Sequence, residues 1–507
     1  MLSKITSFAL CGLEGVPVEV ETDICKGMVS FDLVGLPDAA VKESKERVRS
    51  AVKNSALRFP VNKITINLAP ADVKKEGSQF DLPIAVSILI ASDQLTAATG
   101  NTVFLGELAL DGALRPVAGL LPILISAKAK GFTRFIVPAA NANEASYIEG
   151  LEVFALKNLK EVVDCLTGAQ EFSPVSQRSF KAAVSSQKYN SDLSLVRGQK
   201  VAKRALEVAV AGGHNILLAG PPGTGKTMLA RCIPTIMPDM TFEEALEVTK
   251  IHSVAGTLTE EGIVSLRPFR TPHHTSTVVA LCGGGNSKAH PGEISMAHKG
   301  VLFLDELPEY TRRTLESLRQ PLEDRVITVA RAGGAVTFPA DFMLCASMNP
   351  CPCGNYGSAY LSCTCTPAQI QRYKSKISGP LLDRIDLQVE VDGIKYDDLT
   401  GDGNEETSAE VKKRIEKARA VQRIRFEDEP NSLNSGMGEK QIKKYCKLSP
   451  ECEDILRAAF ETLRLSARAR SRIIKVARTI ADLDFSADIL PEHILEAASY
   501  RSCGADS

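Results

Sequence analysis

The sequence predicts an α/β protein in three parts: an α+β N-terminal domain, a core of buried parallel strands and helices, and an all-helical C-terminal domain. Three observations favour this organisation. Through the first 170 residues, apolar residues alternate as in strands or recur at helical spacing. Beyond residue 193, short apolar runs alternate with helical stretches, which is typical of a parallel sheet covered by helices. After about residue 394, only helical patterns remain.

The bulk composition is that of a globular protein. The chain has 507 residues, of which 44% are hydrophobic and 24% charged, and this length suggests about three domains. The net charge of −1 excludes a general basic field, so any contact with nucleic acid must be local. No apolar run reaches the roughly 18 residues that a membrane span needs, and the first residues lack the pattern of a signal peptide. We therefore expect a cytoplasmic protein without membrane contact.

The pattern places the domain boundaries. In the N-terminal domain, expected over residues 1–170, residues 17–24 and 63–70 alternate as strands do, and residues 39–56 carry apolar side chains at helical spacing. The polar, serine-rich stretch 171–192 indicates a linker.

The core is expected over 193–393, and it opens with a helix over 198–213 and a buried strand over 215–220. The helical domain is expected over 394–507. Its helical patterns cover 405–426, 449–463, 468–483 and 491–501.

The strongest motif, GPPGTGKT, follows the strand over 215–220 and opens a helix. It fits the pattern G-x-x-x-x-G-K-[ST] of a phosphate-binding loop. Glycines let backbone N–H groups close around phosphate oxygens, and the helix N-terminus favours the anion. The lysine bridges the β- and γ-phosphates, and the threonine offers its hydroxyl to Mg²⁺. The motif predicts that Mg²⁺ and ATP bind at Gly220, Pro221, Pro222, Gly223, Thr224, Gly225, Lys226 and Thr227.

Two further strands end in polar residues. The apolar run over 301–304 ends in Asp305 and Glu306, and the run over 341–348 ends in Asn349. Acids at the carboxyl end of a strand face the nucleotide crevice of an open α/β sheet. We expect Asp305 to hold Mg²⁺ and Glu306 to polarise the attacking water. Asn349 is expected to orient that water or to sense the γ-phosphate.

Four cysteines follow directly on Asn349, in the stretch CPCGNYGSAYLSCTC. They are Cys351, Cys353, Cys363 and Cys365. Four thiolates are enough for a tetrahedral Zn²⁺ site, although C-x-C spacing is less typical of structural zinc than C-x-x-C. Packed reduced thiols are the plain alternative. A disulfide is disfavoured in the cytoplasm, and nothing else in the sequence suggests the redox chemistry of an iron–sulfur cluster.

The order of phosphate loop, acidic strand and asparagine-ending strand resembles the AAA+ ATPases. The motifs RPFRTPHHTSTVVALCGGG, HPGEISMAHKGVLFLDELPE, MNPCPCG and SGPLLDRIDL extend this resemblance over nearly the whole chain. They resemble the ComM/YifB family of magnesium-chelatase-like AAA+ ATPases. This resemblance implies an AAA+ core with a C-terminal helical lid of the magnesium-chelatase type. It also implies a ring, a homo-hexamer with ATP at subunit interfaces.

The resemblance also assigns roles outside the loop. Arg384, in LLDRID, matches the arginine finger that reaches a neighbour's γ-phosphate, and its plain alternative is a surface ion pair with Asp383 or Asp386. Arg468 best matches the second sensor on the lid, with Arg470 and Arg472 as competitors. Gln199 lies where the family contacts the base end of the nucleotide.

Rings of this class act on polymers threaded through the pore. Residues 325–340 predict a hairpin around Gly333 and Gly334, similar to the pre-sensor hairpin of related helicases. Arg331 near its turn, and Arg270 before a glycine-rich loop, would suit DNA phosphates. Subunit contacts are the alternative role of these arginines. For the adjacent pair His273 and His274, packing is favoured over a metal site because no acidic or cysteine partner is near in sequence.

The N-terminal stretches 74–92 and 106–138 resemble the Lon-type protease fold, which is ribosomal protein S5 domain 2-like. Lon-type chemistry needs a serine nucleophile and a lysine base. Ungapped placement of the family pattern puts Asp81 at the serine position and Leu121 at the lysine position, with Ser78 out of register. This predicts a domain without the catalytic Ser/Lys pair.

The resemblance implies an ATP-hydrolysing motor that acts on single-stranded or branched DNA. The expected activity is that of a helicase promoting branch migration during natural transformation or recombination. A chelatase-like ATPase that remodels a protein partner is the main alternative, and an ATP-dependent protease is a weaker one. A scaffold without activity is disfavoured by the joint presence of Lys226, Asp305, Glu306 and Arg384.

Overall fold

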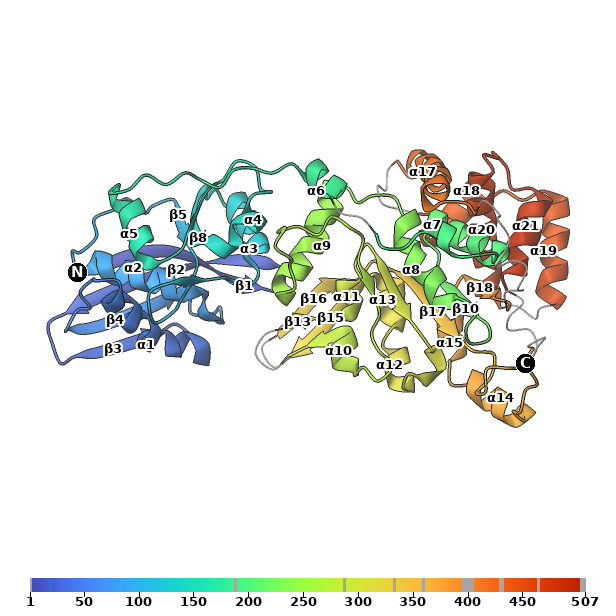
Figure 1. Ribbon diagram of the computed structural model, residues 1–507, viewed down its shortest axis with the longest axis horizontal. Helices are drawn as coiled ribbons and strands as arrows, with labels where there is room; N and C mark the ends of the chain where they lie inside the picture. Colours follow the sequence, from blue (N-terminus) through green and yellow to red (C-terminus); the bar gives the residue numbers. More distant parts are fainter. Residues whose placement is uncertain are drawn as a thin grey trace.

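The computed structural model shows an N-terminal domain, an α/β core and a C-terminal group of helices that follow one another along the long axis of the molecule (Figure 1). No helix in the described part of the chain is long and apolar enough to cross a membrane. The structure describes residues 2–186, 189–285, 289–331, 334–357, 361–393, 405–427, 433–462 and 466–501.

The N-terminal domain is built on a seven-stranded mixed sheet in the order β3-β4-β2-β1-β5-β8-β9. The strands are β1 (Leu2–Cys11), β2 (Glu14–Cys25), β3 (Ser30–Val34), β4 (Lys63–Ala69), β5 (Thr102–Phe104), β8 (Arg134–Pro138) and β9 (Glu152–Leu156). A small hairpin, β6 (Glu107–Leu108) and β7 (Leu114–Arg115), stands apart from it. The helices are α1 (Ala39–Asn54), α2 (Asp81–Ala91), α3 (Leu120–Ala129), α4 (Ala142–Ala145) and α5 (Leu159–Thr167), with short 3₁₀ turns at Ser78–Phe80 and Ala139–Asn141.

The alternation seen in the sequence explains this sheet. The stretches 17–24 and 63–70 fall in β2 and β4, and the helix expected over 39–56 is α1. Helices α1 and α2 share one apolar core with the strands, and α3 contributes to a second, because the sheet buries side chains on both faces. The expectation for these elements is confirmed.

The linker is partly helical. Helix α6 (Phe180–Ser186) lies within 171–192, and its Ala183 packs with Tyr147 of the N-terminal domain and Met240 of the core. The sequence did not indicate this apolar contact, because only a few residues of α6 take part in it and the rest of the stretch is polar and rich in serine. The linker therefore packs at the junction of the two domains.

The N-terminal domain docks on α9 (Phe242–Ala255) of the core through polar contacts. The Gly119 amide donates to the Ser253 carbonyl at 3.0 Å, and the Ser253 hydroxyl donates to the buried Glu144 carboxylate. The Asn143 side chain donates to the Glu260 carbonyl at 2.5 Å. Burial raises the pKa of Glu144.

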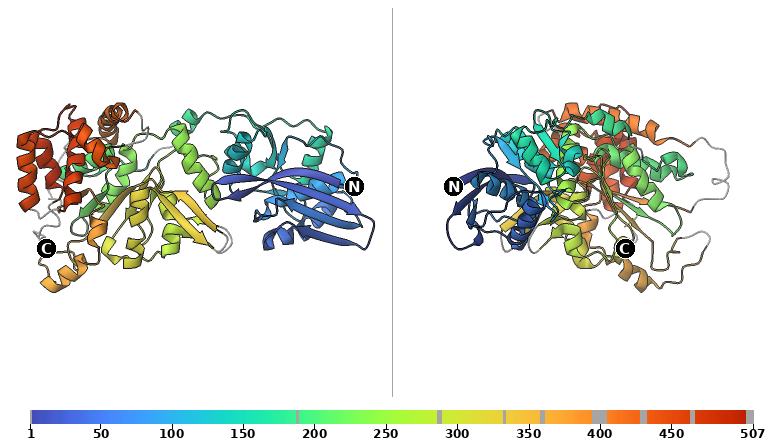
Figure 2. Two further views of the ribbon diagram at one scale, coloured as in Figure 1. Left: turned by 180° about the vertical axis from the view of Figure 1, so that it is seen from behind. Right: turned by 60° about the vertical axis from the view of Figure 1, so that its left-hand side comes forward.

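A second contact joins the β1–β2 hairpin to the core (Figure 2). At its turn, Gly12 has a φ of 62°, and a Cβ there would stand 2.9 Å from Val336. The next residue, Leu13, packs against an apolar cluster of the core. The first domain thus touches the strand pair that contains Val336, which is described below.

The core sheet is parallel throughout, in the order β11-β14-β17-β10-β18. Its strands are β10 (Ile216–Ala219), β11 (Phe269–Arg270), β14 (Val301–Leu304), β17 (Met343–Met348) and β18 (Leu387–Glu390). These strands have two to six residues, and most of their side chains are apolar and buried, as expected for a sheet that is covered on both faces. The longer covering helices are α7 (Lys200–Gly212), α8 (Lys226–Ile236) and α9.

Shorter helices complete the core. They are α10 (Val278–Cys282), α11 (Glu293–Met296), α12 (Arg312–Glu316), α13 (Arg319–Asp324), α14 (Pro367–Lys374) and α15 (Gly379–Leu382), with 3₁₀ turns at Leu193–Leu195 and Leu307–Glu309.

Two hairpins project from the core. One pairs β12 (Gly283–Gly284) with β13 (His290–Pro291). The other pairs β15 (Val326–Arg331) with β16 (Gly334–Pro339), in a register from Val326 opposite Pro339 to Arg331 opposite Gly334. The hairpin expected over 325–340 is therefore confirmed, while the expected turn residue Gly333 lies outside the described residues.

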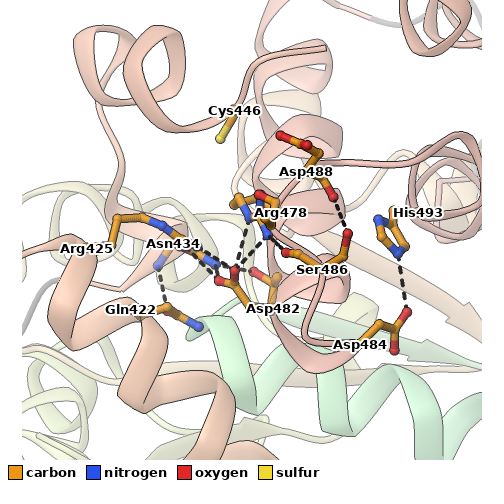
Figure 3. Close-up of polar contacts among 12 residues, drawn as sticks. Gln422, Arg425, Asn434, Cys446, Arg478, Asp482, Asp484, Ser486, Asp488 and His493 are labelled. Carbon is orange, nitrogen blue, oxygen red and sulfur yellow. Dashed lines mark hydrogen bonds and ion pairs between the residues drawn. The ribbon is translucent and has the colours of Figure 1, made fainter. Parts of the chain in front are cut away.

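The described C-terminal residues form α17 (Ser408–Arg425), α18 (Glu439–Tyr445), α19 (Pro450–Thr462), α20 (Ala467–Leu483) and α21 (Pro491–Ser499), with a 3₁₀ turn at Asn434–Gly436. Inside them lies a polar cluster centred on Asp482 (Figure 3). The fully buried Asp482 carboxylate accepts hydrogen bonds from Arg425 at 2.7 Å, from Arg478 at 3.0 Å and from the Asn434 side chain at 2.8 Å. This cluster ties α17, α20 and the 3₁₀ turn together.

We expect Asp482→Ala to destabilise the C-terminal helices by about 3–5 kcal/mol, because it leaves the buried Arg478 and the largely buried Arg425 without their counter-charge. Urea denaturation of the full chain, followed by helical circular dichroism, measures the effect. Asp454→Ala is the matched control, because Asp454 pairs with Arg457 in solvent, where such pairs contribute about 1 kcal/mol or less. Equal midpoints for the two variants would contradict this prediction.

Candidate functional site

The GPPGTGKT loop lies at the carboxyl edge of the core sheet, between the end of β10 and the start of α8. Gly223 and Gly225 have φ angles of 80° and 85°, which glycine adopts without strain. A Cβ at either position would meet nothing within 4 Å, so the space beside both glycines is open. An oxyanion fits such a cradle at a helix N-terminus.

Lys226 points back into the loop. Its ammonium group donates to the carbonyls of Gly220 at 2.6 Å and Pro221 at 2.7 Å, and it lies 3.4 Å from the side-chain oxygen of Asn349. Burial lowers the pKa of Lys226. A cation held among carbonyl oxygens is placed to exchange them for phosphate oxygens, which carry more charge.

Asp305 faces Thr227 across the edge of the sheet. The Thr227 hydroxyl donates to the Asp305 carboxylate at 3.1 Å. The other carboxylate oxygen accepts from the Glu306 amide at 3.1 Å and from the Ser347 hydroxyl. Hydroxyl and carboxylate oxygens are the ligands that Mg²⁺ prefers, so the residues present fit this ion.

Ser347 was missed by sequence reasoning. It precedes Asn349 by two residues, and a period of two puts both on one face of an extended chain. That spacing was the available signal. Its hydroxyl fixes the Asp305 carboxylate from the neighbouring strand β17.

Glu306 has left-handed backbone, with φ at 52°, and its side chain is about half exposed. Its carboxylate lies 3.5 Å from Nδ1 of His274. The His274 ring packs 4.1 Å from the ring of His273. The histidine pair thus packs beside Glu306, a contact that the sequence did not indicate because 31 residues separate the two segments.

Gln199 joins the loop from the start of α7. Its side-chain amide donates to the carbonyl of Asp392 at 2.7 Å and lies 3.4 Å from the carbonyl of Thr224. The structure therefore brings together, at one edge of the sheet, the loop, Asp305, Glu306, Asn349 and Gln199.

Arg384 lies at the opposite, amino edge. β18 starts at Leu387, which pairs with Ile216 at the start of β10, whereas the loop follows the end of β10. Four strand residues span about 13 Å, so Arg384 is remote from the loop of its own chain. Its guanidinium donates to the Pro380 carbonyl at 2.6 Å and pairs with Glu323.

A charged cavity of about 520 Å³ opens beside Arg384 at this amino edge. Arg468 lines the same cavity from α20. The two competing arginines take other partners: Arg470 pairs with Glu453 at 3.0 Å, and Arg472 pairs with the buried Asp386. Arg468 differs from both, because it lines the cavity and has no protein partner among the described residues.

Two arginines are expected to meet DNA, and the structure describes the side chain of one of them, Arg270. Arg270, at the end of β11, forms a two-pronged ion pair with Glu293 at 2.6 and 2.7 Å, which raises its pKa. The nearby carboxylate weakens the attraction of this cation for a phosphate. Arg331 is the last residue of β15, next to the turn of the hairpin.

The four cysteines come together between β17 and α14. Their sulfur atoms all lie within 4.8 Å of one another, and Cys351 is buried. A metal ion needs about three or more His, Cys, Asp or Glu side chains close together. In the described part of the chain, these four cysteines are the one group that meets this condition.

The residues weighed for peptidase chemistry do not form a Ser–Lys pair. Asp81 is buried and forms an ion pair with Arg47 at 2.7 Å, and Leu121 is buried in α3. The Ser78 hydroxyl donates to Glu107, and the Lys75 ammonium donates to the Pro70 carbonyl. The serine and the lysine nearest to the expected positions thus bond to other groups, and neither is the partner of the other.

A parallel sheet with a glycine-rich loop, a buried lysine and a hydroxyl–carboxylate pair at its carboxyl edge defines a P-loop nucleotide-binding protein. The chain matches three family models over most of its length. They describe "Magnesium chelatase, subunit ChlI" over residues 192–399, "Subunit ChlI of Mg-chelatase" over 20–141 and "Magnesium chelatase, subunit ChlI C-terminal" over 405–501.

Two relatives are similar over nearly the full length. Competence protein ComM of Haemophilus influenzae is 43% identical over 504 residues, which cover 99% of this chain and 97% of the relative. Uncharacterized protein YifB of Escherichia coli is 44% identical over 506 residues, with the same coverage. The chain therefore belongs to the ComM/YifB family of magnesium-chelatase-like AAA+ proteins, and this membership supports an ATPase.

A more distant similarity covers only part of the chain. Lon protease 2 of Bacillus subtilis is 29% identical over 125 residues, which are 24% of this chain and 22% of the relative. This similarity agrees with the expectation of a Lon-like segment.

Proposed function

We propose that this protein is the subunit of a homo-hexameric AAA+ ring that hydrolyses ATP and moves DNA, as a helicase promoting branch migration during natural transformation or recombination. One observation carries the ATPase part: Lys226, Thr227, Asp305, Glu306 and Asn349 meet at the carboxyl edge of the core sheet. The proposed cofactors are ATP and Mg²⁺ at this edge and Zn²⁺ at the four cysteines. The cytoplasm is the proposed location.

Each residue has a separate task in this proposal. Lys226 and the loop amides bind the phosphates, while Thr227 and Asp305 hold Mg²⁺, which neutralises charge on the transferring phosphoryl group when bound. Ser347 fixes the Asp305 carboxylate. Glu306 orients the attacking water and accepts its proton, and Asn349 contacts the γ-phosphate. Gln199 lies at the base end of the nucleotide.

The amino edge supplies the other half of the proposed ATP site. Because Arg384 is remote from its own loop, it acts in this proposal on ATP bound to the next subunit, and Arg468 acts beside it from the helical lid over 394–507. In such a head-to-tail contact, the amino edge of one core sheet faces the carboxyl edge of the next subunit's sheet. Repeating this contact from subunit to subunit closes the proposed ring.

The DNA part rests on two supports. The β15–β16 hairpin projects from the core and carries Arg331 beside its turn, where a cation can meet phosphates. The name of the Haemophilus influenzae relative links that protein to competence. The N-terminal domain over 1–170, which touches the hairpin at Gly12, serves assembly or DNA contact in this proposal and not peptide hydrolysis.

The test is the ATPase rate of the purified protein without DNA, with single-stranded DNA and with forked DNA. We expect DNA to raise the ATPase rate of the wild type. The Lys226→Ala variant is expected to show no measurable rate with or without DNA. Hydrolysis that ignores DNA would overturn the DNA part and direct attention to a protein partner. Absence of any hydrolysis in the presence of Mg²⁺ would overturn the ATPase part.

A further inference from the structure

The four cysteine sulfurs are arranged as the corners of one small cage. Sγ of Cys351 lies 3.3 Å from that of Cys353 and 3.7 Å from that of Cys363, and Cys353 and Cys363 are 3.6 Å apart. Four sulfurs bound at about 2.3 Å from one tetrahedral ion stand about 3.8 Å apart. A disulfide would need about 2.05 Å between two sulfurs. The spacing therefore fits a single tetrahedral ion and not a bridge.

The backbone around the sulfurs supports the same conclusion. The amide of Tyr356 donates to Sγ of Cys351 at 3.3 Å, and the amide of Cys365 donates to Sγ of Cys363 at 3.4 Å. Amide donors stabilise the negative charge of thiolates and orient them as ligands. A cluster of several irons must fit between its cysteines, and sulfurs this close leave room for one ion.

The cage stands directly beside the nucleotide loop. Cys351 follows two residues after Asn349, whose side chain lies 3.4 Å from the Lys226 ammonium. Gly354, which directly follows the first C-x-C pair, is buried, and a Cβ there would stand 2.7 Å from Cδ of Pro222 in the loop. The described residues between β17 and α14 contain no helix or strand, so regular backbone pairing does not hold this segment in place.

We infer that the four thiolates bind one Zn²⁺ and that the bound ion clamps the segment 349–354 against the P-loop, so that nucleotide binding and hydrolysis depend on zinc. This inference rests on the proposed ATPase function. A cross-link by metal is the means by which an irregular segment keeps one conformation, because each coordinated thiolate removes chain freedom. Here the fixed segment contains both Asn349 and the glycine that touches Pro222.

The first experiment measures the metal itself. We expect the purified full chain to hold one zinc per chain by elemental analysis, and Co²⁺ substitution to give the absorption bands of tetrahedral cobalt–thiolate. The double variant Cys363→Ser, Cys365→Ser loses both signals. Cys25→Ser is the matched control, because Cys25 is exposed and outside the cage. Wild-type protein without bound zinc and without a cobalt spectrum would overturn the site.

The second experiment measures the coupling by the affinity for a fluorescent ATP analogue and by the rate of hydrolysis. The double cysteine variant is expected to lose about tenfold or more in nucleotide affinity, as supporting groups of a site typically cause. Thermal unfolding followed by circular dichroism checks that the variant is folded. Equal affinity and rate with and without zinc in a folded chain would overturn the clamp.

Two glycine variants distinguish the effect of zinc binding from the effect of the contact between Gly354 and Pro222. Gly354→Ala is expected to retain zinc but to weaken nucleotide binding, because its Cβ displaces Pro222. Gly357→Ala, which has a similar positive φ of 77° and open space around it, is expected to behave as wild type. Equal nucleotide affinity in the two variants would overturn the clamp. If the zinc-loaded wild type binds nucleotide through the clamp and yet does not hydrolyse ATP, the proposed ATPase fails instead.

Discussion

Glu306→Gln is expected to bind ATP with wild-type affinity and to hydrolyse it about 10²–10⁴-fold more slowly, because an amide cannot accept the proton of the attacking water. The carboxylate stands at the open edge of the sheet, next to the Thr227–Asp305 pair, and the Glu306 backbone is held by hydrogen bonds to Asp305 and Ser347. The substitution keeps the size of the side chain and these backbone bonds. Binding and hydrolysis should therefore separate.

The control for this prediction is Glu309→Gln, three residues further along the same segment. Glu309 pairs with Lys376 at 3.4 Å on the surface and does not touch the loop. Its hydrolysis rate should remain within about twofold of wild type, as for most surface substitutions. Equilibrium binding of a fluorescent ATP analogue and steady-state phosphate release measure the two quantities. A Glu306→Gln variant that hydrolyses ATP at the wild-type rate would remove Glu306 from the mechanism.

Arg384→Ala is expected to lower the hydrolysis rate about 10³-fold or more, which is the effect of removing an arginine finger from a phosphoryl-transfer site. The same substitution should leave ATP binding to the isolated subunit unchanged, because Arg384 lies at the edge of the sheet opposite the loop. Arg457→Ala is the matched control, since Arg457 is exposed and pairs only with Asp454 in the described structure. Its rate should equal that of wild type.

Mixing two inactive variants tests whether Arg384 acts across an interface. Arg384→Ala supplies an intact loop, and Lys226→Ala supplies an intact arginine. In an equal mixture that forms rings, about a quarter of the interfaces combine both intact parts, so about a quarter of the wild-type rate should return. A mixture that remains inactive, although both proteins assemble, would show that Arg384 does not serve a neighbour's nucleotide. That outcome would favour the plain ion pair with Glu323.

The amino-acid sequence was sufficient for the parts of the site that depend on short stretches of chain. The spacing of GPPGTGKT after an apolar run placed the phosphate loop, because a strand, a tight glycine turn and a helix start are local events. The ends of the strands at Asp305 and Asn349 were predictable for the same reason, since parallel strands bring their carboxyl ends to one edge. The hairpin of β15 and β16 was visible as two β-rich runs around glycine.

Only the tertiary structure decided which side chains meet across long stretches of sequence. The Ser347–Asp305 bond, the His274–Glu306 contact and the approach of Gly354 to Pro222 join residues whose numbers differ by 32 to 132, and no periodicity encodes such pairs.

The choice among the arginines of α20 also needed the fold. Arg470 pairs with Glu453 and Arg472 pairs with Asp386, and although both Arg472 and Arg468 line the cavity, Arg468 does so without a partner among the described residues. Local sequence thus fixed the chemistry of each group, whereas the packing of helices against the sheet fixed its partners, because contact depends on position in space and not along the chain.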